Sequence, residues 1–344
     1  MPAATLLGSA EPLNAKYDVA LLDLDGVVYI GADAVPEARV ALAQARQRGM
    51  RLAFVTNNAA RPPSDVAAHL TRIGVPADPP EVVTSAQAAA HYLADRLPSG
   101  SRVLVVGTTG LSEALTERGL VPVSRAEDDP AALVQGYSPD LTWRLLAEGA
   151  VAIRHGMPWV ATNLDATVPS PRGPLPGNGS LVAALQHATG RSPVCTGKPD
   201  PTMHRESVER SRASRPLVVG DRLDTDIEGA NAVGCDSMLV LTGVTSAADL
   251  ITASRRRRPR YVADDLSGLN SDHPTPEQTA DGVTCRGWRV IWSGQSLLLS
   301  GRQAQTGDHL DALRALCVAG WHSGAHRVST DDEPAKTVVD RLGL

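Results

Sequence analysis

Short runs of consecutive apolar residues recur along the chain, and each ends in small or polar residues. The runs are VALLDLDG at 19–26, LAFVTNN at 52–58, VLVVGTTG at 103–110, PLVVGD at 216–221 and MLVLTG at 238–243. Continuous apolarity, rather than strict alternation, is typical of strands that are buried on both faces of a sheet. The pattern therefore predicts buried strands at these positions.

Helical patterns lie between these runs. They cover 36–48, 85–97, 111–118, 140–155 and 200–211. Gly49 and Gly119 follow two of them, where glycine is favoured after a helix end, and Pro36 suits a first helical turn. The alternation of strands and helices predicts an α/β fold with a doubly wound parallel sheet, in which ligands bind at the carboxyl ends of the strands.

The pattern changes from about residue 271. The segment SDHPTPEQTADG, at 271–282, is rich in Pro and acidic residues and is predicted to be a linker. Beyond it, GWRVIWSGQSLLLSG predicts a hairpin around Gly294, and 308–319 predicts a helix. Residues 271–344 are therefore expected to form a small C-terminal α+β unit that contributes no catalytic atom.

Composition narrows the class of protein. The 344 residues, 42% of them apolar and 21% charged, are typical of a globular chain of two or three domains. The net charge of -5 does not favour a nucleic-acid partner, and no apolar stretch is long enough to span a membrane. Four widely spaced cysteines without CxxC favour reduced thiols rather than zinc or disulfides. The N-terminus lacks the basic region of a signal peptide, so we expect a cytoplasmic protein.

The segment after the first strand carries two carboxyl groups. Asp23 and Asp25 stand at positions i and i+2, where one side chain can attack a substrate while the other transfers a proton. The alternative is an aspartate turn in which Gly26 supplies a positive φ. That alternative explains the local sequence, but not the polar residues that follow the other strands.

Thr56, Asn57 and Asn58 follow the second strand. A hydroxyl and successive backbone N–H groups at a strand end form a cradle that suits a phosphoryl group. A purely structural Asx turn explains the same three residues equally well.

Lys198 is one of only three lysines, and it precedes Asp200, a predicted helix N-cap. An ammonium group at this position can offset the charge of a phosphate and of a nucleophilic carboxylate. Asp221 follows the fourth strand, and such carboxylates suit Mg²⁺, which prefers one or two of them together with phosphate oxygens and water. Asp224 is predicted to cap the following helix instead.

Taken in order, DLDGV, TNN, GKP and GDRLDTD resemble the four motifs of haloacid dehalogenase-type phosphatases over residues 17 to 270. The resemblance is closest to the phosphoglycolate, pyridoxal-phosphate and nitrophenyl-phosphatase branch, which has a large cap between the second and third motifs. It implies a phosphatase core at 1–99 and 193–270 and an inserted α/β cap at 100–192. Residues 271–344 are an added unit, for which a degenerate acetyltransferase-like remnant is one interpretation.

The resemblance also implies a role for each motif residue. Asp23 is expected to be the nucleophile and Asp25 the general acid and then base, with a pKa raised toward neutrality. Thr56, Asn57 and Asn58 would bind the phosphoryl group and Lys198 would neutralise charge. Mg²⁺ would be held by Asp23, the backbone carbonyl of Asp25 and Asp221. Asp226 would contact and orient these ligands without binding the cation itself.

The substrate is expected to be a small phosphorylated metabolite. An arginine-rich, lysine-poor chain with an added C-terminal unit is most similar to the actinobacterial glycerol 3-phosphate phosphatases, which implies glycerol 3-phosphate, with 2-phosphoglycolate as the alternative. A receiver-like signalling module is a rival from another class, but it needs neither a second acid nor a cap. The segment 160–185 resembles the substrate loop of the cap and contributes Asn163, Asp165, Val168 and Pro169 as candidates. A homo-oligomer formed through the cap is also expected.

Overall fold

The computed structural model describes residues 6–168, 172–279, 281–301 and 309–344. The chain forms two compact units. The first comprises Met1–Ile30, Ala34–Leu52 and Ser214–Leu344, and the second comprises Gly31–Asp33 and Ala53–Ala213.

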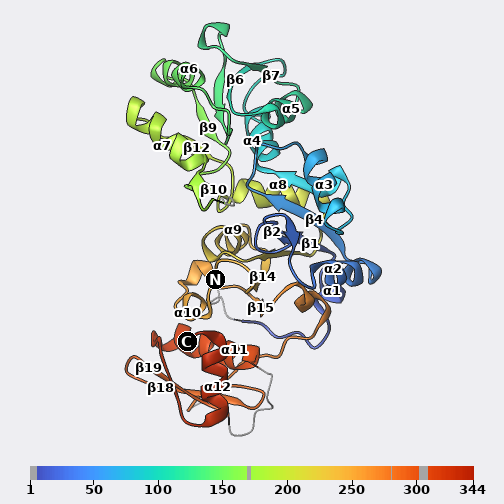
Figure 1. Cartoon of the computed structure of the whole chain (residues 1–344), viewed down its shortest axis with the longest axis vertical. Coiled ribbons are helices and arrows are strands. Elements are labelled where there is room, and N and C mark those ends of the chain that lie inside the picture. The colour runs from blue at the N-terminus through green and yellow to red at the C-terminus, as the bar shows by residue number, and fades with distance from the viewer. Residues whose placement is uncertain (1–5, 169–171, 280, 302–308) are drawn as a thin grey trace. The chain divides into compact units, whose positions relative to one another are not determined.

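The first unit contains parallel strands in the order β15-β14-β13-β1 (Figure 1). Every residue of β1 is buried, in agreement with its continuous apolar sequence. The strands are β1 (Val19–Leu22), β13 (Pro216–Gly220), β14 (Asp236–Val240) and β15 (Tyr261–Ala263). The helices and helical turns among them are α1 (Leu13–Lys16), α2 (Ala38–Gln47), η3 (Leu223–Ile227), α9 (Glu228–Val233), α10 (Ala247–Ile251), η4 (Arg255–Arg257) and η5 (Leu266–Asn270). Two short strands, β2 (Tyr29–Ile30) and β3 (Asp33–Ala34), pair with each other.

Strand β4 (Arg51–Thr56) begins in the first unit and continues into the second, where it pairs with β5 (Val82–Thr84). The second unit also contains a five-stranded parallel sheet in the order β12-β9-β8-β6-β7. Its strands are β6 (Arg102–Val106), β7 (Val121–Val123), β8 (Ala132–Gln135), β9 (Trp159–Ala161) and β12 (Val194–Cys195). A small ribbon pairs β10 (Thr167–Val168) with β11 (Leu175–Pro176). The helices and helical turns are α3 (Pro63–Arg72), η1 (Pro79–Glu81), α4 (Ser85–Ala94), α5 (Thr109–Glu117), η2 (Ala126–Asp128), α6 (Trp143–Arg154), α7 (Asn178–Thr189) and α8 (Pro201–Ser211).

Both faces of this five-stranded sheet are covered. Val103 and Val105 of β6 belong to a buried cluster that includes residues of α4 and α5. Leu104 and Val106, which point to the opposite face, belong to a second cluster with residues of α6 and α7. Successive side chains of a strand point to opposite faces, so a strand covered on both sides must be apolar throughout. The prediction of parallel, doubly covered α/β sheets is confirmed.

The C-terminal part of the first unit forms a mixed sheet in the order β16-β17-β18-β19-β20. Its elements are β16 (Glu277–Thr279), β17 (Gly282–Cys285), β18 (Trp288–Ser293), β19 (Ser296–Ser300), α11 (His309–Ser323), β20 (Arg327–Thr330) and α12 (Glu333–Leu342). The predicted hairpin is confirmed, because Ser293 pairs with Ser296 around Gly294 at φ +57°. The prediction of a linker over 271–282 is wrong at β16, whose exposed polar residues form an antiparallel pair with β17.

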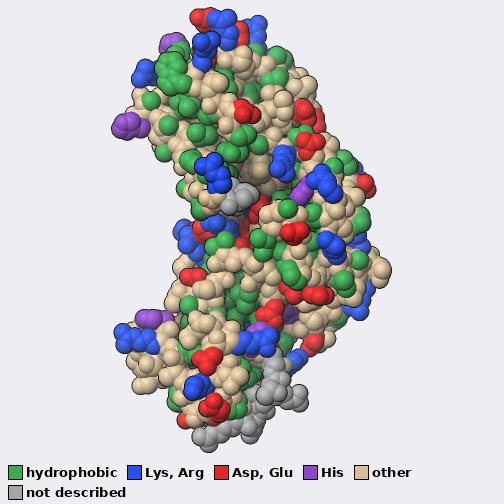
Figure 2. Space-filling model, viewed as in Figure 1, with side chains coloured by type: hydrophobic (Ala, Val, Ile, Leu, Met, Phe, Trp, Pro, Cys, Tyr) green, Lys and Arg blue, Asp and Glu red, His purple; other side chains and the backbone are tan. Residues whose placement is uncertain are grey.

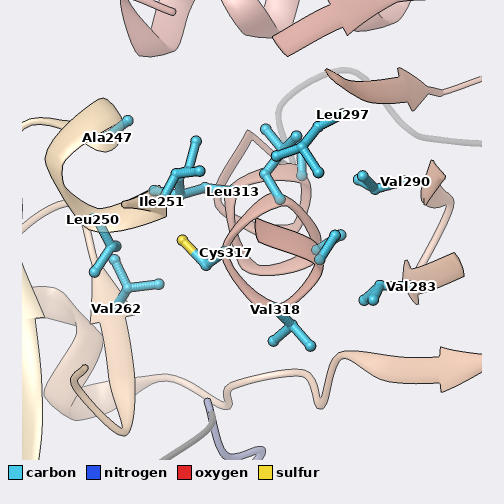
Figure 3. Packing of buried hydrophobic residues seen from close by; sticks show 14 of the residues in the cluster. Ala247, Leu250, Ile251, Val262, Val283, Val290, Leu297, Leu313, Cys317 and Val318 are labelled. Atoms are coloured by element: carbon cyan, nitrogen blue, oxygen red, sulfur yellow. The ribbon is translucent and has the colours of Figure 1, made fainter. Parts of the chain in front are cut away.

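One apolar cluster joins this C-terminal sheet to the rest of the first unit. It runs from Leu250 and Ile251 of α10, through Leu313 and Cys317 of α11, to Val290 of β18 (Figure 3). Burial of apolar surface contributes ~25 cal/mol per Å², so a shared cluster makes the parts stabilise each other. The residues beyond 271 therefore do not form a solvated tail.

On the face drawn in Figure 2, basic and acidic side chains are interspersed. Within the described residues, no helix is long and apolar enough to cross a membrane. The four cysteines are free thiols in this structure.

Candidate functional site in two groups of motif residues

Asp23 lies where β1 ends. Its N–H donates to the carbonyl of Val219 at 2.9 Å, which extends the parallel pairing with β13 by one residue. The chain then turns sharply, because Gly26 adopts φ +83° and donates its N–H to the carbonyl of Tyr29 at 2.8 Å. The turn leaves Asp23 partly buried and the side chain of Asp25 exposed. The aspartate turn that was the alternative interpretation is therefore formed, and it places the carboxyl groups of Asp23 and Asp25 at the end of β1.

Asp221 lies directly after β13 and is 1% exposed. Its carboxylate oxygen Oδ2 accepts the N–H of Val244 at 2.8 Å, and its backbone carbonyl accepts the N–H of Thr245 at 3.2 Å. The loop after β14 therefore fixes both the side chain and the backbone of this aspartate. The loop also touches the first motif, because the hydroxyl of Thr242 donates to the carbonyl of Gly26.

Asp226 is placed by η3, a single π-helical turn of the kind that is frequent at functional sites. Its Oδ2 accepts the N–H of Arg222 at 3.2 Å. Asp23, Asp221 and Asp226 each offer a carboxylate oxygen, and these oxygens lie within 4.8 Å of one another. Sequence reasoning gave Asp226 only a supporting role, whereas its carboxylate belongs to the same close group as those of the two expected ligands.

The surroundings of this acidic group suit a hard divalent cation. Three carboxylate oxygens so close together repel one another unless a cation or protons balance their charge, and oxygen donors are the ligands that Mg²⁺ prefers. Glycines leave the space around Asp221 open: a Cβ atom on Gly243 would fall 1.9 Å from Asp221 Oδ2, and one on Gly26 would fall 2.7 Å from it. The residues of the first unit therefore fit a magnesium site.

The second unit holds the other motif residues, beginning where β4 ends. Thr56 is 4% exposed, and its Oγ1 accepts the N–H of Asn58 at 3.1 Å. Oδ1 of Asn58 in turn accepts the N–H of Ala60 at 2.8 Å, which is the Asx turn left open by the sequence. A hydroxyl that accepts one bond still has its O–H to donate, so the turn and a phosphate cradle are compatible at Thr56.

Asn57 connects this turn to Lys198. Its Oδ1 accepts the N–H of Lys198 at 2.8 Å, and its Nδ2 donates to the carbonyl of Lys198 at 3.2 Å and to Oδ2 of Asp165 at 3.2 Å. The neighbouring Gly197 must lack a side chain, because its Cβ would fall 2.2 Å from the carbonyl oxygen of Thr162. The structure thus joins the second and third motifs through one amide.

Lys198 is 4% exposed. Cys195, three residues earlier, is partly buried, and burial raises the pKa of its thiol to about 11. A thiol with such a pKa is protonated at neutral pH and is a weak nucleophile. Cys195 is therefore not a candidate for the nucleophile, although it lies close to Lys198 in sequence.

The candidate residues of the cap loop have different environments. Asn163 is buried, donates from Nδ2 to the carbonyl of Asn57 at 2.7 Å, and accepts at its backbone carbonyl from Asn178 at 2.8 Å. Val168 is partly exposed on β10. Pro169 lies outside the described residues. The contacts of Asn163 support the turn at Asn57 directly.

A cavity of about 1170 Å³ opens in the second unit, beside the turn at Asn58. Its walls come from the segments that follow β4, β6, β7 and β8, and they carry the hydroxyl groups of Thr108, Ser112 and Ser124 together with Arg61. Such a lining suits a polar rather than an apolar ligand.

A second group of potential metal ligands in this unit has another explanation. His91, Glu206 and Glu209 lie close together, but Glu206 also pairs with Arg118 at 2.9 Å and with Arg210. Burial raises the pKa of Glu206, but the hydrogen bonds from Arg210 and His91 outweigh it and lower the pKa overall. Two guanidinium groups on one carboxylate disfavour a cation, so this group is an ion-pair network that connects α4, α5 and α8.

Sequence reasoning missed the residues that support the motifs. Val244 and Gly243 act through a backbone N–H and a missing side chain, neither of which a residue type reveals. Ser85, whose hydroxyl donates to the carbonyl of Asn57 at 2.5 Å, stands far from the motif in sequence. The only signal at this position is that Ser85 begins the predicted helix 85–97.

Family models match most of the chain. A model described as haloacid dehalogenase-like hydrolase matches residues 20–121, and a HAD-hydrolase-like model matches residues 195–269. A third, described as a GCN5-related N-acetyltransferase like domain, matches residues 285–344. These ranges cover all four motifs and most of the C-terminal sheet.

Individual relatives agree with the models. The chain is 44% identical to the D-glycerol 3-phosphate phosphatase of Mycobacterium tuberculosis over 96% of this chain and 95% of that protein. The crystal structure of glycerol phosphate phosphatase from that organism in complex with magnesium has a TM-score of 0.90 at 44% identity, covering 98% of this chain and 100% of that one. The acid sugar phosphatase of Staphylococcus aureus is 35% identical over 73% of this chain and 96% of that protein. Because the identity to characterised phosphatases extends over nearly the whole of the chain, it belongs to the haloacid dehalogenase-like hydrolases and is one of their phosphatases.

Proposed function

We propose that this phosphatase hydrolyses glycerol 3-phosphate with Mg²⁺ bound at the acidic group of the first unit. The observation that carries the proposal is the approach of three carboxylate oxygens, from Asp23, Asp221 and Asp226, to within 4.8 Å of one another. The 44% identity to a D-glycerol 3-phosphate phosphatase supports the choice of substrate.

Asp23, Asp221 and the backbone carbonyl of Asp25 would hold the cation, and Asp226 would complete or support the set. When bound, Mg²⁺ offsets the charge of the phosphate dianion and of the carboxylates around it. The N–H of Val244 donates to Oδ2 of Asp221 and so fixes the orientation of the whole carboxylate, including Oδ1. Such outer contacts orient a ligand and tune its affinity for metal.

Asp23 would act as the nucleophile. Its carboxylate attacks the phosphorus atom, the bond from phosphorus to the alcohol oxygen breaks, and an aspartyl phosphate forms. Asp25 gives its proton to the departing alcohol oxygen. It then takes a proton from water, whose oxygen attacks the same phosphorus atom and releases inorganic phosphate. The side chain of Asp25 is exposed, so a neighbouring charge rather than burial would have to raise its pKa.

The residues of the second unit would bind the transferring phosphoryl group. Thr56 would donate its hydroxyl, the backbone of Asn57 would donate its N–H, and Lys198 would supply a positive charge, whereas the N–H of Asn58 donates to Thr56 Oγ1 and so orients that hydroxyl. The amide of Asn57 is occupied by Lys198 and Asp165, so its side chain would position Lys198 rather than touch phosphate.

The cavity beside Asn58 supports a small polar leaving group. Hydroxyl groups of Thr108 and Ser112 can pair with those of glycerol. Arg61 in the same wall can pair instead with the carboxylate of 2-phosphoglycolate, which is therefore the competing substrate. Asp165, Val168 and Pro169 would contribute to the same substrate loop, whereas the contacts of Asn163 support a structural role.

The organisation of the protein follows the same proposal. Residues 1–99 and 193–270 would form the phosphatase core, 100–192 the cap, and 271–344 an acetyltransferase-like remnant. Trp143, 81% exposed at the start of α6, and Val151, 41% exposed two turns later, would favour association of two copies through the cap. Free thiols favour a cytoplasmic location.

The test measures phosphate release from glycerol 3-phosphate, 2-phosphoglycolate and p-nitrophenyl phosphate. We expect glycerol 3-phosphate to give a kcat/KM at least about tenfold above that of 2-phosphoglycolate. EDTA should abolish turnover and Mg²⁺ should restore it. Asp23→Asn should lose more than about 99% of the rate because covalent catalysis is removed. Full activity in metal-free buffer, or in Asp23→Asn, would contradict the proposal.

A further inference from the structure

The loop after β14 lies between the two acidic segments of the first unit. The hydroxyl of Thr242 donates to the carbonyl of Gly26, and the N–H of Val244 donates to Asp221 Oδ2 at 2.8 Å. The backbone of Gly243 passes close to the same carboxylate, since a Cβ on this residue would fall 1.9 Å from Asp221 Oδ2. A small displacement of this loop would therefore move a carboxylate of the metal site.

Helix α10 begins immediately after this loop. Ser246 caps it, accepting the N–H of Asp249 at 3.2 Å while Asp249 Oδ2 accepts the N–H of Ser246 at 3.0 Å. Only five residues long, α10 is far below the length at which a helix is stable alone. Its position must be set by what it packs against.

Helix α11 of the C-terminal sheet is what covers α10. Leu250 and Ile251 are buried in the cluster that contains Leu313 and Cys317 of α11 (Figure 3). The packing is close, because a Cβ on Gly320 would lie 3.0 Å from Cγ2 of Ile251 and 3.1 Å from its carbonyl oxygen.

Trp321 adds a directed contact to this packing. Its indole N–H donates at 2.9 Å to the carbonyl of Leu250 near the end of α10, which also accepts the N–H of Ala253 at 3.1 Å. Arg258 strengthens the tie, donating to the carbonyls of Ala253 at 3.1 Å and Trp321 at 3.4 Å, with its guanidinium 5.0 Å from the indole ring. Hydrogen bonds therefore fix both the loop before α10, at Gly26 and Asp221, and the end of α10, at Trp321 and Arg258.

We infer that the C-terminal sheet acts on the phosphatase reaction through Trp321, which holds α10 and so keeps the N–H of Val244 on Asp221. Trp321 is a positioning residue: it contacts no reacting group, and its effect reaches the cation through the loop. The inference rests on the proposed binding of Mg²⁺ at Asp221.

The experiment measures Mg²⁺ binding by calorimetry in the full-length protein, alongside the Mg²⁺ dependence of phosphate release. Trp321→Phe removes the indole N–H but keeps an aromatic ring. We expect it to raise the Kd for Mg²⁺ by about three- to tenfold, while kcat at saturating Mg²⁺ changes less than about twofold. Arg258→Gln, which removes the second tie, should shift the Kd in the same direction.

The control is Val338→Ala on α12, which opens space in the same apolar cluster and should lower Tm. If Val338→Ala leaves the Kd for Mg²⁺ unchanged while Trp321→Phe and Arg258→Gln raise it, the inference stands. An unchanged Kd in both of those variants, or an equal rise in Val338→Ala, would overturn it. Asp221→Ala separates the two proposals. If this variant binds Mg²⁺ with the parental Kd, the metal site itself is refuted. If it loses Mg²⁺ binding while Trp321→Phe keeps the parental Kd, only the role of Trp321 is refuted.

Discussion

The side-chain amide of Asn57 pairs with both polar backbone groups of Lys198. Oδ1 accepts the lysine N–H at 2.8 Å and Nδ2 donates to the lysine carbonyl at 3.2 Å, although 141 residues separate the two in sequence. An amide is one of the few side chains that offers a donor and an acceptor side by side. Asn57 therefore positions the backbone from which the ammonium group of Lys198 extends.

The first prediction concerns this pairing. Asn57→Asp keeps the acceptor for the N–H of Lys198, but it places a carboxylate against the lysine carbonyl and against Asp165. We expect kcat to fall by at least about tenfold, because repulsion between these oxygens displaces Lys198. Steady-state phosphate release measures the effect. Asn14→Asp is the control, since Asn14 bonds Asn270 at 2.6 Å in the first unit. Parental kcat in Asn57→Asp would show that this pairing does not position Lys198.

The strand ends and their carboxylates could be predicted because the sequence marks them directly. Asp23 and Asp221 follow continuous apolar runs, and parallel strands present such ends on one edge of a sheet. What holds Asp221 could not be predicted, since Val244 acts through its N–H and Gly243 through an absent side chain. Edge strand β16 could not be predicted, because its residues are polar and exposed and its pairing with β17 buries none of them. Asn163 was assigned to the substrate loop by resemblance, yet it bonds the backbone of Asn57.

The second prediction tests Asp25 as general acid. Asp25→Asn cannot give a proton to the departing oxygen, which matters most for an alcohol of high pKa. We expect kcat/KM for glycerol 3-phosphate to fall at least about tenfold more than that for p-nitrophenyl phosphate, whose phenolate leaves without a proton. Parallel assays of the two substrates with one enzyme preparation measure the ratio. Equal losses on both would exclude this role for Asp25.

The third prediction concerns the space around Asp221. In Gly243→Ala the new methyl group would fall 1.9 Å from Asp221 Oδ2, so either the carboxylate or the loop must move. We expect the Mg²⁺ concentration for half-maximal activity to rise by about tenfold or more. Titration of Mg²⁺ into both proteins at saturating substrate measures it. Unchanged half-saturation would mean that the loop accommodates the methyl group without moving Asp221.

His273 is a buried histidine of the first unit whose protonation links the stability of the protein to pH. His273 is 2% exposed, bonds the carbonyl of Gly268 at 2.9 Å, and lies 3.3 Å from the guanidinium of Arg314. Burial lowers the pKa of His273 to about 4 and Arg314 adds to this shift, while the hydrogen bond to Gly268 and the nearby Asp272 oppose it. The folded protein therefore holds this imidazole neutral at a pH at which the unfolded chain protonates it.

The fourth prediction follows from the sign of that shift. Between an ordinary histidine pKa near 6.5 and the folded value of about 4, the unfolded state binds the extra proton, so the free energy of unfolding falls as pH falls. From pH 7 to pH 5 we expect this residue to contribute a loss of about 2 kcal/mol. Urea unfolding at the two pH values measures it. His273→Gln should remove that part of the pH dependence, while His326→Gln, at an exposed histidine of the same unit, should keep it. If both variants lose stability with acid as steeply as the parent protein, His273 is not the group that titrates.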